Sequence, residues 1–524
     1  MKSYSRKKHS RYEPSLTFSQ PPHIYELMNY HIISRLLGVL LIVLSGAMST
    51  SIFFSELFNE RDTTYALLNA VFITLTAGGI LFFIGRRYAH ATISRREALV
   101  VVSLSWILIG VFGALPYLYD GVFFRYGLFH NYTDAFFETI SGFTTTGSTV
   151  LDPVLTTEIE KLSHGLHYWR SLTHWLGGMG IIVLFIAIFP QLGVGAKHLF
   201  RSEVPGPITE GLKPKIKETS TVLWRIYVGL TLIEFLILIS PVCDMGWFDA
   251  LCHSFATMAT GGFSTKNGSV ADFNSVSIDL VITLFMFLAG VNFSLYYVAL
   301  TRRSPLAIFK DTEFRTYLGI VVAATVLVAL NIWEFRHENL FQAFRHAAFQ
   351  VTAMITTTGF GTDDFDLYPT FSKLLLVCLM FIGGSAGSTA GGIKVSRIIV
   401  LIKAAHYEIY KTFRPQRVIS VKINNSTIPD DIIRSIFGFF VIAITTFVGG
   451  SLFMTLFDYD LATATTAVAA TLFNIGPGLS QVGATMNFAF IPPIGKLFLS
   501  FCMILGRLEF YTLLVLIVPD FWRR

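Results

Sequence analysis

Ten apolar runs, each long enough to cross a bilayer as a helix, constrain this chain more than any other feature. A crossing helix needs about 20 residues to span a hydrocarbon core of about 30 Å. The runs lie near 33–54, 65–85, 98–119, 171–192, 222–242, 278–300, 315–333, 372–402, 433–457 and 491–518. Only 14% of the 524 residues are charged, whereas soluble domains average about 25%. The sequence therefore predicts an all-α polytopic membrane protein.

Four shorter apolar stretches lie between these runs, and each ends at a turn rich in threonine, glycine or both. The stretches are 134–143, 247–259, 340–355 and 461–473. The turns are TTTGSTVL (Thr144–Leu151), MATGGFST (Met258–Thr265), TTTGFGTD (Thr356–Asp363) and FNIGPGLS (Phe473–Ser480). A helix of about 10–14 residues covers about half of the hydrocarbon core. We therefore expect re-entrant half-helices, which leave the membrane on the side from which they enter.

The charges of the connecting segments alternate in sign along the chain. Basic segments hold Arg86, Arg87, Arg95 and Arg96; Lys197, Arg201, Lys213, Lys215 and Lys217; Arg302, Arg303 and Lys310; and Lys403, Lys411, Arg414, Arg417 and Lys422. Acidic segments hold Glu56, Glu60 and Asp62; Asp152, Glu158 and Glu160; Asp363, Asp364 and Asp366; and Asp458 and Asp460. Lys and Arg mark the cytoplasmic side. Both termini are therefore predicted to be cytoplasmic, and the four turns to face outward.

A unit of span, half-helix, turn and span occurs four times after two extra spans. Its reference glycines, Gly147, Gly261, Gly359 and Gly476, are separated by 114, 98 and 117 residues. The predicted division is a cytoplasmic tail 1–30, a two-helix membrane domain 31–92, and pore repeats 93–197, 198–305, 306–425 and 426–524. The predicted fold is thus four repeats around a pseudo-fourfold pore, preceded by two transmembrane helices.

Non-helical backbone at membrane depth is tolerated only inside protein or beside a watery cavity. Four such turns around one axis can present a ring of carbonyl oxygens that replaces the hydration shell of a cation. Glycine accepts positive φ, which aims successive carbonyls inward, and each half-helix directs its partly negative C-terminal end toward the ion. Small residues also allow close helix packing, but four occurrences at the same place in the unit favour an ion pathway.

Two features are candidates for a gate. Gly383 to Gly392 reads GGSAGSTAGG inside an apolar run, and five glycines disfavour helix by about 5 kcal/mol. We expect a break or loop, with a tight helix crossing as the alternative. Arg507 lies at a similar distance from its turn, inside another apolar run. An intramembrane arginine faces a pore or an acidic partner, and Glu509 and Glu234 are the acids considered.

Other polar residues carry weaker predictions. Asp134, Glu138 and Asp249 lie on half-helices and could attract cations or cap helices, and Lys394 could be an interfacial anchor. No Ser/His/Asp constellation, phosphate-binding lysine motif or dinucleotide fingerprint occurs. We therefore expect no enzyme activity and no nucleotide bound by this chain. The net charge of +6 is confined largely to connecting segments, which argues against a nucleic-acid partner.

From about residue 30 the chain resembles the TrkH family of the Trk/Ktr/HKT superfamily of potassium channels and transporters. The resemblance rests on the four turns and on HWLGGMGIIVL (His174–Leu184), GGSAGSTAGGIKVSR (Gly383–Arg397), NIGPGLSQVG (Asn474–Gly483) and GRLEFYTLLVL (Gly506–Leu516). It implies K⁺ uptake across a bacterial inner membrane, a homodimer, and a cytoplasmic nucleotide-binding TrkA-type partner. It also implies that the loop below the filter obstructs the pore, with Gly383, Gly384, Gly387, Gly391, Gly392 and Arg507 as the gate residues.

Carried over by position, the K⁺ filter is Thr145-Thr146-Gly147, Ala259-Thr260-Gly261, Thr357-Thr358-Gly359 and Asn474-Ile475-Gly476. Backbone carbonyls are the expected ligands, and threonine hydroxyls are a weaker possibility. The alternative function is a K⁺/H⁺ or K⁺/Na⁺ symporter that uses the same filter. Symporters commonly contain inverted repeats, whereas these four units share one orientation, which favours a pore.

Overall fold

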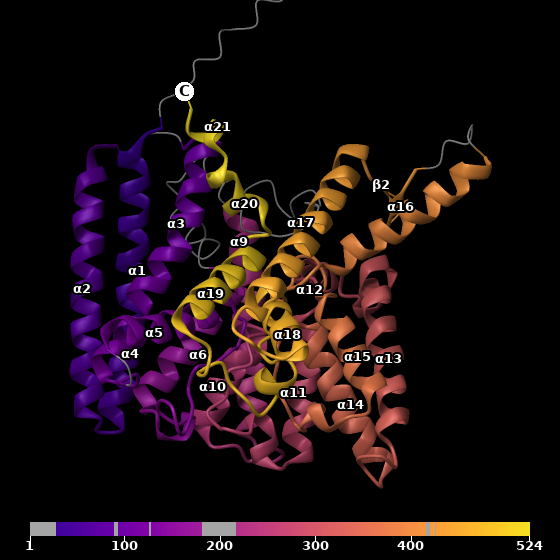
Figure 1. Ribbon diagram of the computed structural model, residues 1–524, viewed down its shortest axis with the longest axis horizontal. Coiled ribbons are helices and arrows are strands. Elements are labelled where there is room, and N and C mark those ends of the chain that lie inside the picture. Colours follow the sequence, from indigo (N-terminus) through magenta and orange to yellow (C-terminus); the bar gives the residue numbers. More distant parts are fainter. Residues whose placement is uncertain are drawn as a thin grey trace, which may run out of the picture.

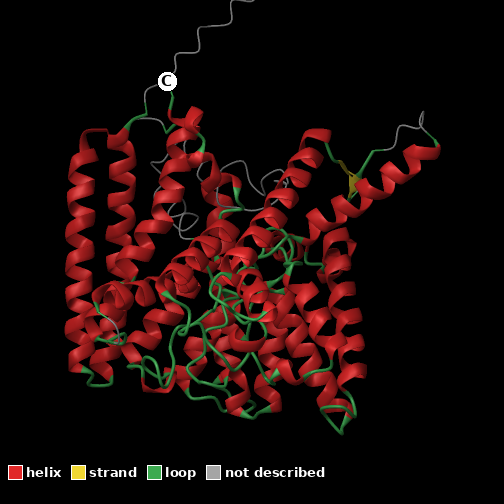
Figure 2. Cartoon of the chain, in the orientation of Figure 1, coloured by secondary structure: helices red, strands yellow, loops and turns green. Residues whose placement is uncertain are grey.

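The computed structural model describes residues 28–88, 93–124, 127–180, 216–414, 420–424 and 426–523, and most of them are helical (Figures 1 and 2). Nearly all of the predicted N-terminal tail, the basic residues from Lys197 to Lys215, Arg417 and the end of the fourth apolar run lie outside the described residues.

The two extra helices form an antiparallel pair at one edge of the molecule (Figure 1). They are α1 (Tyr30–Leu57) and α2 (Arg61–Gly85). Small residues let their backbones approach closely, because a Cβ built on Gly38 would lie 2.7 Å from the carbonyl oxygen of Gly78. The predicted two-helix addition is confirmed.

Four successive units follow this pair. The first contains α3 (Arg95–Gly113), α4 (Leu115–Asp120), α5 (Leu128–Phe143) and α6 (His164–Gly178). The second contains α9 (Ile216–Leu238), α10 (Trp247–Met258), α11 (Val276–Ala289) and α12 (Phe293–Arg302). The third contains α13 (Thr312–Ile332), α14 (Leu340–Ile355), α15 (Thr370–Met380) and α16 (Val395–Phe413). The fourth contains α17 (Asp430–Thr455), α18 (Leu461–Leu472), α19 (Pro493–Arg507) and α20 (Tyr511–Leu514).

Smaller elements complete the described chain. Two strands, β1 (Lys422–Ile423) and β2 (Ser426–Thr427), pair antiparallel between the third and fourth units. A last short helix, α21 (Pro519–Trp522), lies near the C-terminus. The remaining pieces are the 3-10 helices Arg86–Tyr88, Ile159–Lys161, Ser269–Phe273, Pro305–Lys310, Phe365–Leu367, Ser480–Val482 and Val515–Ile517.

The half-helices are α5, α10, α14 and α18, with 16, 12, 16 and 12 residues. Local capping starts two of them: the side chains of Asn339 and Asp460 accept hydrogen bonds from the first turns of α14 and α18. The prediction of short helices is confirmed at all four positions, although α5 begins six residues earlier than expected. Figure 2 shows the loops that follow them gathered in the middle of the molecule.

The second spans of the second and fourth repeats are bent, which the sequence did not predict. In the described part of the chain, six helices are long and apolar enough to cross a membrane, and two further pairs pass only as bent spans. The runs near 278–300 and 491–518, each predicted as one span, are bent helix pairs. The first bends by 90° between α11 and α12, and the second by 112° between α19 and α20.

Both bends have local causes. The side chain of Asn292 accepts a hydrogen bond from the N–H of Ser294 and starts a new helix at α12. After α19, Glu509 and Phe510 adopt positive φ angles of 54° and 61°, which end the helix. The third repeat also breaks, between α15 and α16, where the glycine-rich run predicted a break. Interrupted helices therefore recur in the second, third and fourth repeats.

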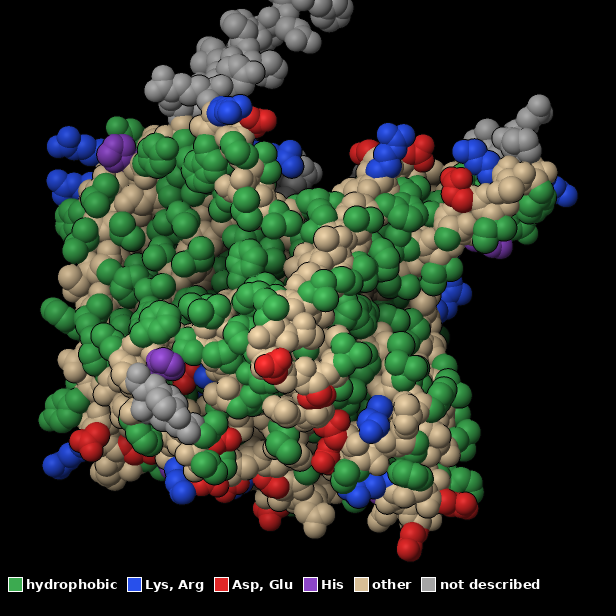
Figure 3. Space-filling view, in the orientation of Figure 1, with side chains coloured by type: hydrophobic (Ala, Val, Ile, Leu, Met, Phe, Trp, Pro, Cys, Tyr) green, Lys and Arg blue, Asp and Glu red, His purple; other side chains and the backbone are tan. Residues whose placement is uncertain are grey.

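Charge divides the two edges of the molecule. The described N-terminal and C-terminal ends share one edge: the N–H of Asn29 donates to Glu97 at 2.7 Å, and Arg96 donates to the carbonyl of Arg523 at 3.4 Å. Figure 3 shows Lys and Arg gathered along this basic edge, Asp and Glu most numerous along the opposite, acidic edge, and an apolar band between them. This distribution agrees with the alternation of charge along the sequence.

Candidate ion pathway

The four turns share one backbone path. Just after each half-helix, one residue adopts the left-handed conformation: Thr145, Thr260, Thr357 and Asn474, with φ of 54°, 55°, 57° and 57°. Two residues later a glycine has positive φ: Gly147, Gly262, Gly359 and Gly476, with φ of 85°, 82°, 75° and 104°. Glycine takes such angles without a Cβ clash. The repeated path shows that the four turns are structurally equivalent.

These four glycines close a ring, because each faces the backbone carbonyl of the next repeat. The facing pairs are Gly147 with Gly261, Gly262 with Thr358, Gly359 with Ile475, and Gly476 with Thr146. A Cβ on Gly476 would lie 2.7 Å from the carbonyl oxygen of Thr146, and the other three glycines are even closer to their neighbouring carbonyls. The order runs from repeat one to repeat four and returns to repeat one. The turns therefore surround a single axis.

The structure corrects the sequence alignment of the second turn by one residue. The glycine with positive φ is Gly262, whereas the sequence pattern pairs Gly261 with the other reference glycines. Ala259 caps α10 and corresponds to Thr144 of the first turn. Both Gly261 and Gly262 can adopt positive φ, so sequence pattern alone does not choose between them. The equivalent segment is Thr260-Gly261-Gly262.

The fourth turn differs from the other three in having Asn474 where they have a threonine. Asn474 occupies the left-handed position, which asparagine tolerates better than most residues. Its Nδ2 donates to the hydroxyl of Thr146 at 2.9 Å and to the carbonyl of Met503 at 3.0 Å. Asn474 therefore joins the fourth turn to the first.

The glycine loop, Gly383–Gly392, lies directly against the turns. The N–H of Gly391 donates to the hydroxyl of Thr357 at 2.6 Å, and the hydroxyl of Thr389 donates to the carbonyl of Met258 at 3.0 Å. Gly387 and Gly392 have positive φ, at 73° and 67°. The loop thus contacts the third turn and the end of the second half-helix, and the predicted break in the helix is confirmed.

Arg507, the last residue of α19, joins three parts of the molecule. Its guanidinium donates to the hydroxyl of Thr145 and to the carbonyl of Thr389, both at 3.2 Å. It also donates to the carbonyl of Gly178 at 2.9 Å and to that of Gly177. Arg507 and the glycine loop therefore lie at the same depth, as the sequence predicted.

Of the acids considered as partners of Arg507, Glu509 lines the same cavity as Arg507 and Glu234 is fully buried. Glu509 forms an ion pair with Arg397. Neither carboxylate oxygen of Glu234 has a hydrogen-bond partner in the described part of the chain. The acceptors described above for Arg507 are the hydroxyl of Thr145 and the carbonyl oxygens of Thr389, Gly177 and Gly178.

A cavity of about 80 Å³ lies where the loop, α6 and α19 meet. Its lining includes Gly178, Ala390, Lys394, Arg507 and Glu509. Lys394 is only 3% exposed, and its ammonium donates to the carbonyl of Ala390. The reading of Lys394 as an interfacial anchor is therefore wrong. Two cationic side chains line this cavity beside the turns.

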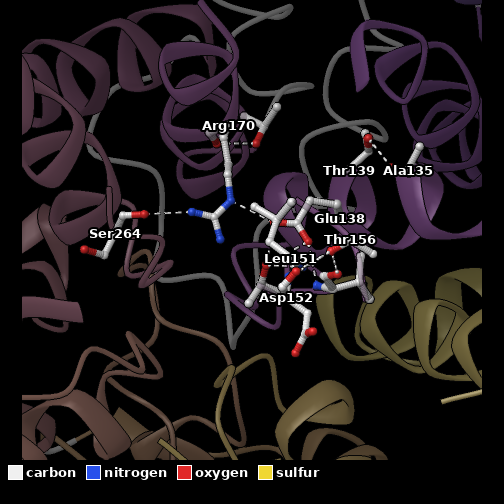
Figure 4. A network of polar contacts seen from close by, with 11 residues as sticks. Ala135, Glu138, Thr139, Leu151, Asp152, Thr156, Arg170 and Ser264 are labelled. Atoms are coloured by element: carbon white, nitrogen blue, oxygen red, sulfur yellow. Dashed lines mark hydrogen bonds and ion pairs between the residues drawn. The ribbon is translucent and has the colours of Figure 1, made fainter. Parts of the chain in front are cut away.

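A buried ion pair supports the turns from the first repeat, and sequence analysis missed its meaning. Arg170 on α6 donates through Nε to Glu138 on α5 at 2.7 Å and through Nη1 to the carbonyl of Ser264 at 2.9 Å (Figure 4). Glu138 therefore does not cap its helix. The available signal was Arg170 itself, an arginine near the start of an apolar run, which is as costly there as Arg507.

Comparison with known proteins identifies the family. The family model for TrkH, a cation transport protein, matches residues 65–524. The chain is 39% identical to the Trk system potassium uptake protein TrkH of Salmonella typhimurium and 38% identical to that of Escherichia coli K12, each over 95% of this chain and 100% of the relative. The crystal structure of the potassium transporter TrkH from Vibrio parahaemolyticus superposes with a TM-score of 0.83 at 34% identity, over 95% of this chain and 100% of that one. The chain therefore belongs to the TrkH family of cation transport proteins.

Proposed function

We propose that the protein takes up K⁺ through a selectivity filter formed by its four turns. The observation that carries the proposal is the closed ring, in which each glycine lies against a carbonyl of the next repeat. A ring of carbonyl dipoles suits a dehydrated monovalent cation. The relatives are Trk system potassium uptake proteins, which supports K⁺ as the cation.

The proposed ligands are backbone carbonyls of the four turns. They belong to Thr145-Thr146-Gly147, Thr260-Gly261-Gly262, Thr357-Thr358-Gly359 and Asn474-Ile475-Gly476. The hydroxyls of Thr144 and Thr146 lie 2.7 Å apart and bond each other, as do those of Thr356 and Thr358. Hydroxyls that already bond each other support the assignment of carbonyls as the principal ligands.

The ion would enter from the acidic edge. A hollow of about 700 Å³ there is lined by residues that follow the first, third and fourth turns, among them Asp152, Asp364 and Asp366. Acidic groups at a narrow entrance raise the local cation concentration. With the basic edge on the cytoplasmic side, both termini would be cytoplasmic and the hollow would face outward.

The gate would consist of the glycine loop and Arg507, on the cytoplasmic side of the filter. The carbonyl of Thr389 in the loop accepts a hydrogen bond from Arg507, so movement of either one disturbs the other. We further propose, from the family resemblance, that the chain forms a homodimer and that a cytoplasmic nucleotide-binding partner of the TrkA type shifts this gate.

Reversal potentials of the purified protein in proteoliposomes test the function. A K⁺ gradient opposed by Na⁺ should give a potential close to the K⁺ equilibrium value, with no dependence on a proton gradient. A potential that follows the proton or Na⁺ gradient at fixed stoichiometry would instead identify a symporter. If no K⁺ flux is measured even when the gate is opened, as in the loop deletion described next, the proposal is contradicted.

Shortening the glycine loop should raise basal flux. Deleting residues 386–390 removes the carbonyl that Arg507 binds and the hydroxyl of Thr389, so we expect flux to increase severalfold. Ion preference should remain, because the filter lies outside the deletion. Tracer uptake and reversal potentials on the same vesicles measure both quantities.

A graded variant accompanies the deletion. Thr389→Val removes only the hydroxyl bonds to Met258 and Ala289 and should increase flux less than the deletion does. If the deletion variant is folded and its flux equals that of the parent, the loop is a packing element and not a gate.

A further inference from the structure

We infer that the buried pair Glu138–Arg170 is a positioning device that fixes the first and second turns relative to each other and thereby sets ion selectivity. The inference rests on the proposed function of the turns as a filter. It assigns a role to two residues that lie behind the turns and contribute no carbonyl to the ring.

Glu138 holds the segment that leaves the first turn. Its carboxylate accepts hydrogen bonds from the N–H of Val150 at 2.9 Å and from the hydroxyl of Thr149 at 3.0 Å. The side chain is fully buried. These bonds fix the backbone two to three residues beyond Gly147.

Arg170 carries this constraint to the second turn. Besides its bond to Glu138, it donates to the carbonyl of Ser264, two residues beyond Gly262. Its guanidinium carbon also lies 3.5 Å from the centre of the Phe263 ring, a cation–π contact. Arg170 is 2% exposed. The planar guanidinium therefore links the outgoing segments of two neighbouring turns.

Residues at the position equivalent to Glu138 also hold the outgoing segment in the second and third repeats. Nine residues before the glycine of each of the first three turns lie Glu138, His253 and Gln350. His253 Nε2 lies 3.0 Å from the hydroxyl of Ser264, and Gln350 Nε2 donates to the carbonyl of Asp363 at 3.0 Å. Each side chain holds the segment that leaves its own turn.

The fourth repeat departs at this position but keeps the tether. It has Ala467, and the hydroxyl of the neighbouring Thr466 instead accepts from the N–H of Leu479 at 2.8 Å. A polar tether on the half-helix is thus common to the four turns. In the first repeat the tether is a carboxylate that also binds Arg170, so it reaches a second turn.

A general stabilising role explains the pair less well. Buried ion pairs add little net stability over apolar residues of similar volume, because both charges lose hydration. Charge-assisted hydrogen bonds are nevertheless short and directional. A device that must hold two backbone segments at a fixed separation uses this directionality, and discrimination by a carbonyl ring depends on the placement of its oxygens.

The test compares two neutralised pairs on the same half-helix. Glu138→Gln with Arg170→Gln removes both charges of the pair and leaves no lone buried charge. The matched control is Asp134→Asn with Lys496→Gln: Asp134 lies one helical turn before Glu138 and binds Lys496 at 2.5 Å. Lys496 also donates to the carbonyl of Ala489, outside the turns. The K⁺/Na⁺ permeability ratio from reversal potentials is the readout, and melting temperature is recorded in parallel.

We expect the permeability ratio to fall about tenfold or more in the Glu138/Arg170 variant, since the charge-assisted hydrogen bonds that hold both outgoing segments are lost or weakened. The control should stay within about twofold of the parent, because this buried pair and the bond of Lys496 to Ala489 do not hold the segments that leave the turns. An equal fall in both double variants, or no fall in the first, overturns the inference. A parent protein that does not discriminate K⁺ from Na⁺ would refute the proposed function itself, which separates the two failures.

A milder variant serves if the double substitution does not fold. Thr149→Val removes the hydroxyl that donates to the carboxylate of Glu138 and accepts from the N–H of Leu151, and it keeps the ion pair. It should lower the ratio by about threefold, less than the double variant does, because the bond from the N–H of Val150 to Glu138 and the ion pair remain. A folded Thr149→Val protein with the selectivity of the parent contradicts the inference.

Discussion

Serine at Gly147, Gly262 or Gly359 is expected to abolish K⁺ flux or its preference over Na⁺. A Cβ at each position would collide with a backbone carbonyl of the neighbouring repeat, and the positive φ adds strain of about 1–3 kcal/mol. The collision can be relieved only if the backbone carbonyl moves, because the Cβ position does not depend on the side-chain rotamer. We expect selectivity to fall by about a hundredfold, or conduction to stop. Reversal potentials and tracer flux measure the change.

Gly361 provides the control, two residues beyond Gly359. A Cβ there would meet its nearest atom, Nε2 of Gln350, at 3.8 Å, an ordinary contact, so Gly361→Ala should conduct with the selectivity of the parent.

The second turn tests the corrected register. A Cβ on Gly261 would meet the ring of His174, whereas one on Gly262 would meet the carbonyl of Thr358. Removing the ring with His174→Ala should therefore rescue Gly261→Ala but not Gly262→Ala. Unchanged reversal potentials in the serine variants of Gly147, Gly262 and Gly359 would remove the filter assignment.

Local sequence patterns predicted the features that depend on local physics. Half-helices follow from apolar length, and the third and fourth were placed within one residue of α14 (Leu340–Ile355) and α18 (Leu461–Leu472). The break at the glycine loop follows from helix propensity, because five glycines within ten residues cannot hold a stable helix. These properties belong to short segments, so a single sequence contains them.

Features set by contacts between distant segments were not predictable in the same way. Hydropathy is the same for a straight helix and for a bent one, so it could not show the bends after α11 and α19. Phe510 carries no sign of its positive φ. Glu138 and Arg170 are 32 residues apart in sequence, and Ser264 belongs to the next repeat. Only the fold brings these residues together, although two charged residues in apolar surroundings already indicated that partners must exist.

Arg507→Ala is expected to increase K⁺ flux by up to about a hundredfold. A fixed charge about 6 Å from a passing K⁺, at an effective dielectric constant near 20, repels it by about 2.8 kcal/mol, which is about a hundredfold in passage. The variant also frees the carbonyl of Thr389, so the glycine loop loses a tether as the barrier disappears. Selectivity should persist, because the carbonyl ring is unaltered.

Arg507→Lys separates charge from geometry. Lysine keeps the positive charge but lacks the planar fork that reaches Thr145, Thr389 and the end of α6 together. If charge dominates the barrier, the lysine variant conducts like the parent. If the tether dominates, its flux rises toward that of the alanine variant.

If Arg507 has only a structural role, Arg507→Ala should lower K⁺ flux and not raise it. Its observed acceptors include neutral carbonyls beside a cavity, so water can hydrate them once the guanidinium is gone. A dry site would instead lose about 1–3 kcal/mol for each unsatisfied acceptor, and the melting temperature would fall together with flux. Flux and melting temperature measured on one purified preparation distinguish these cases. A destabilised alanine variant that conducts less than the parent would refute the barrier.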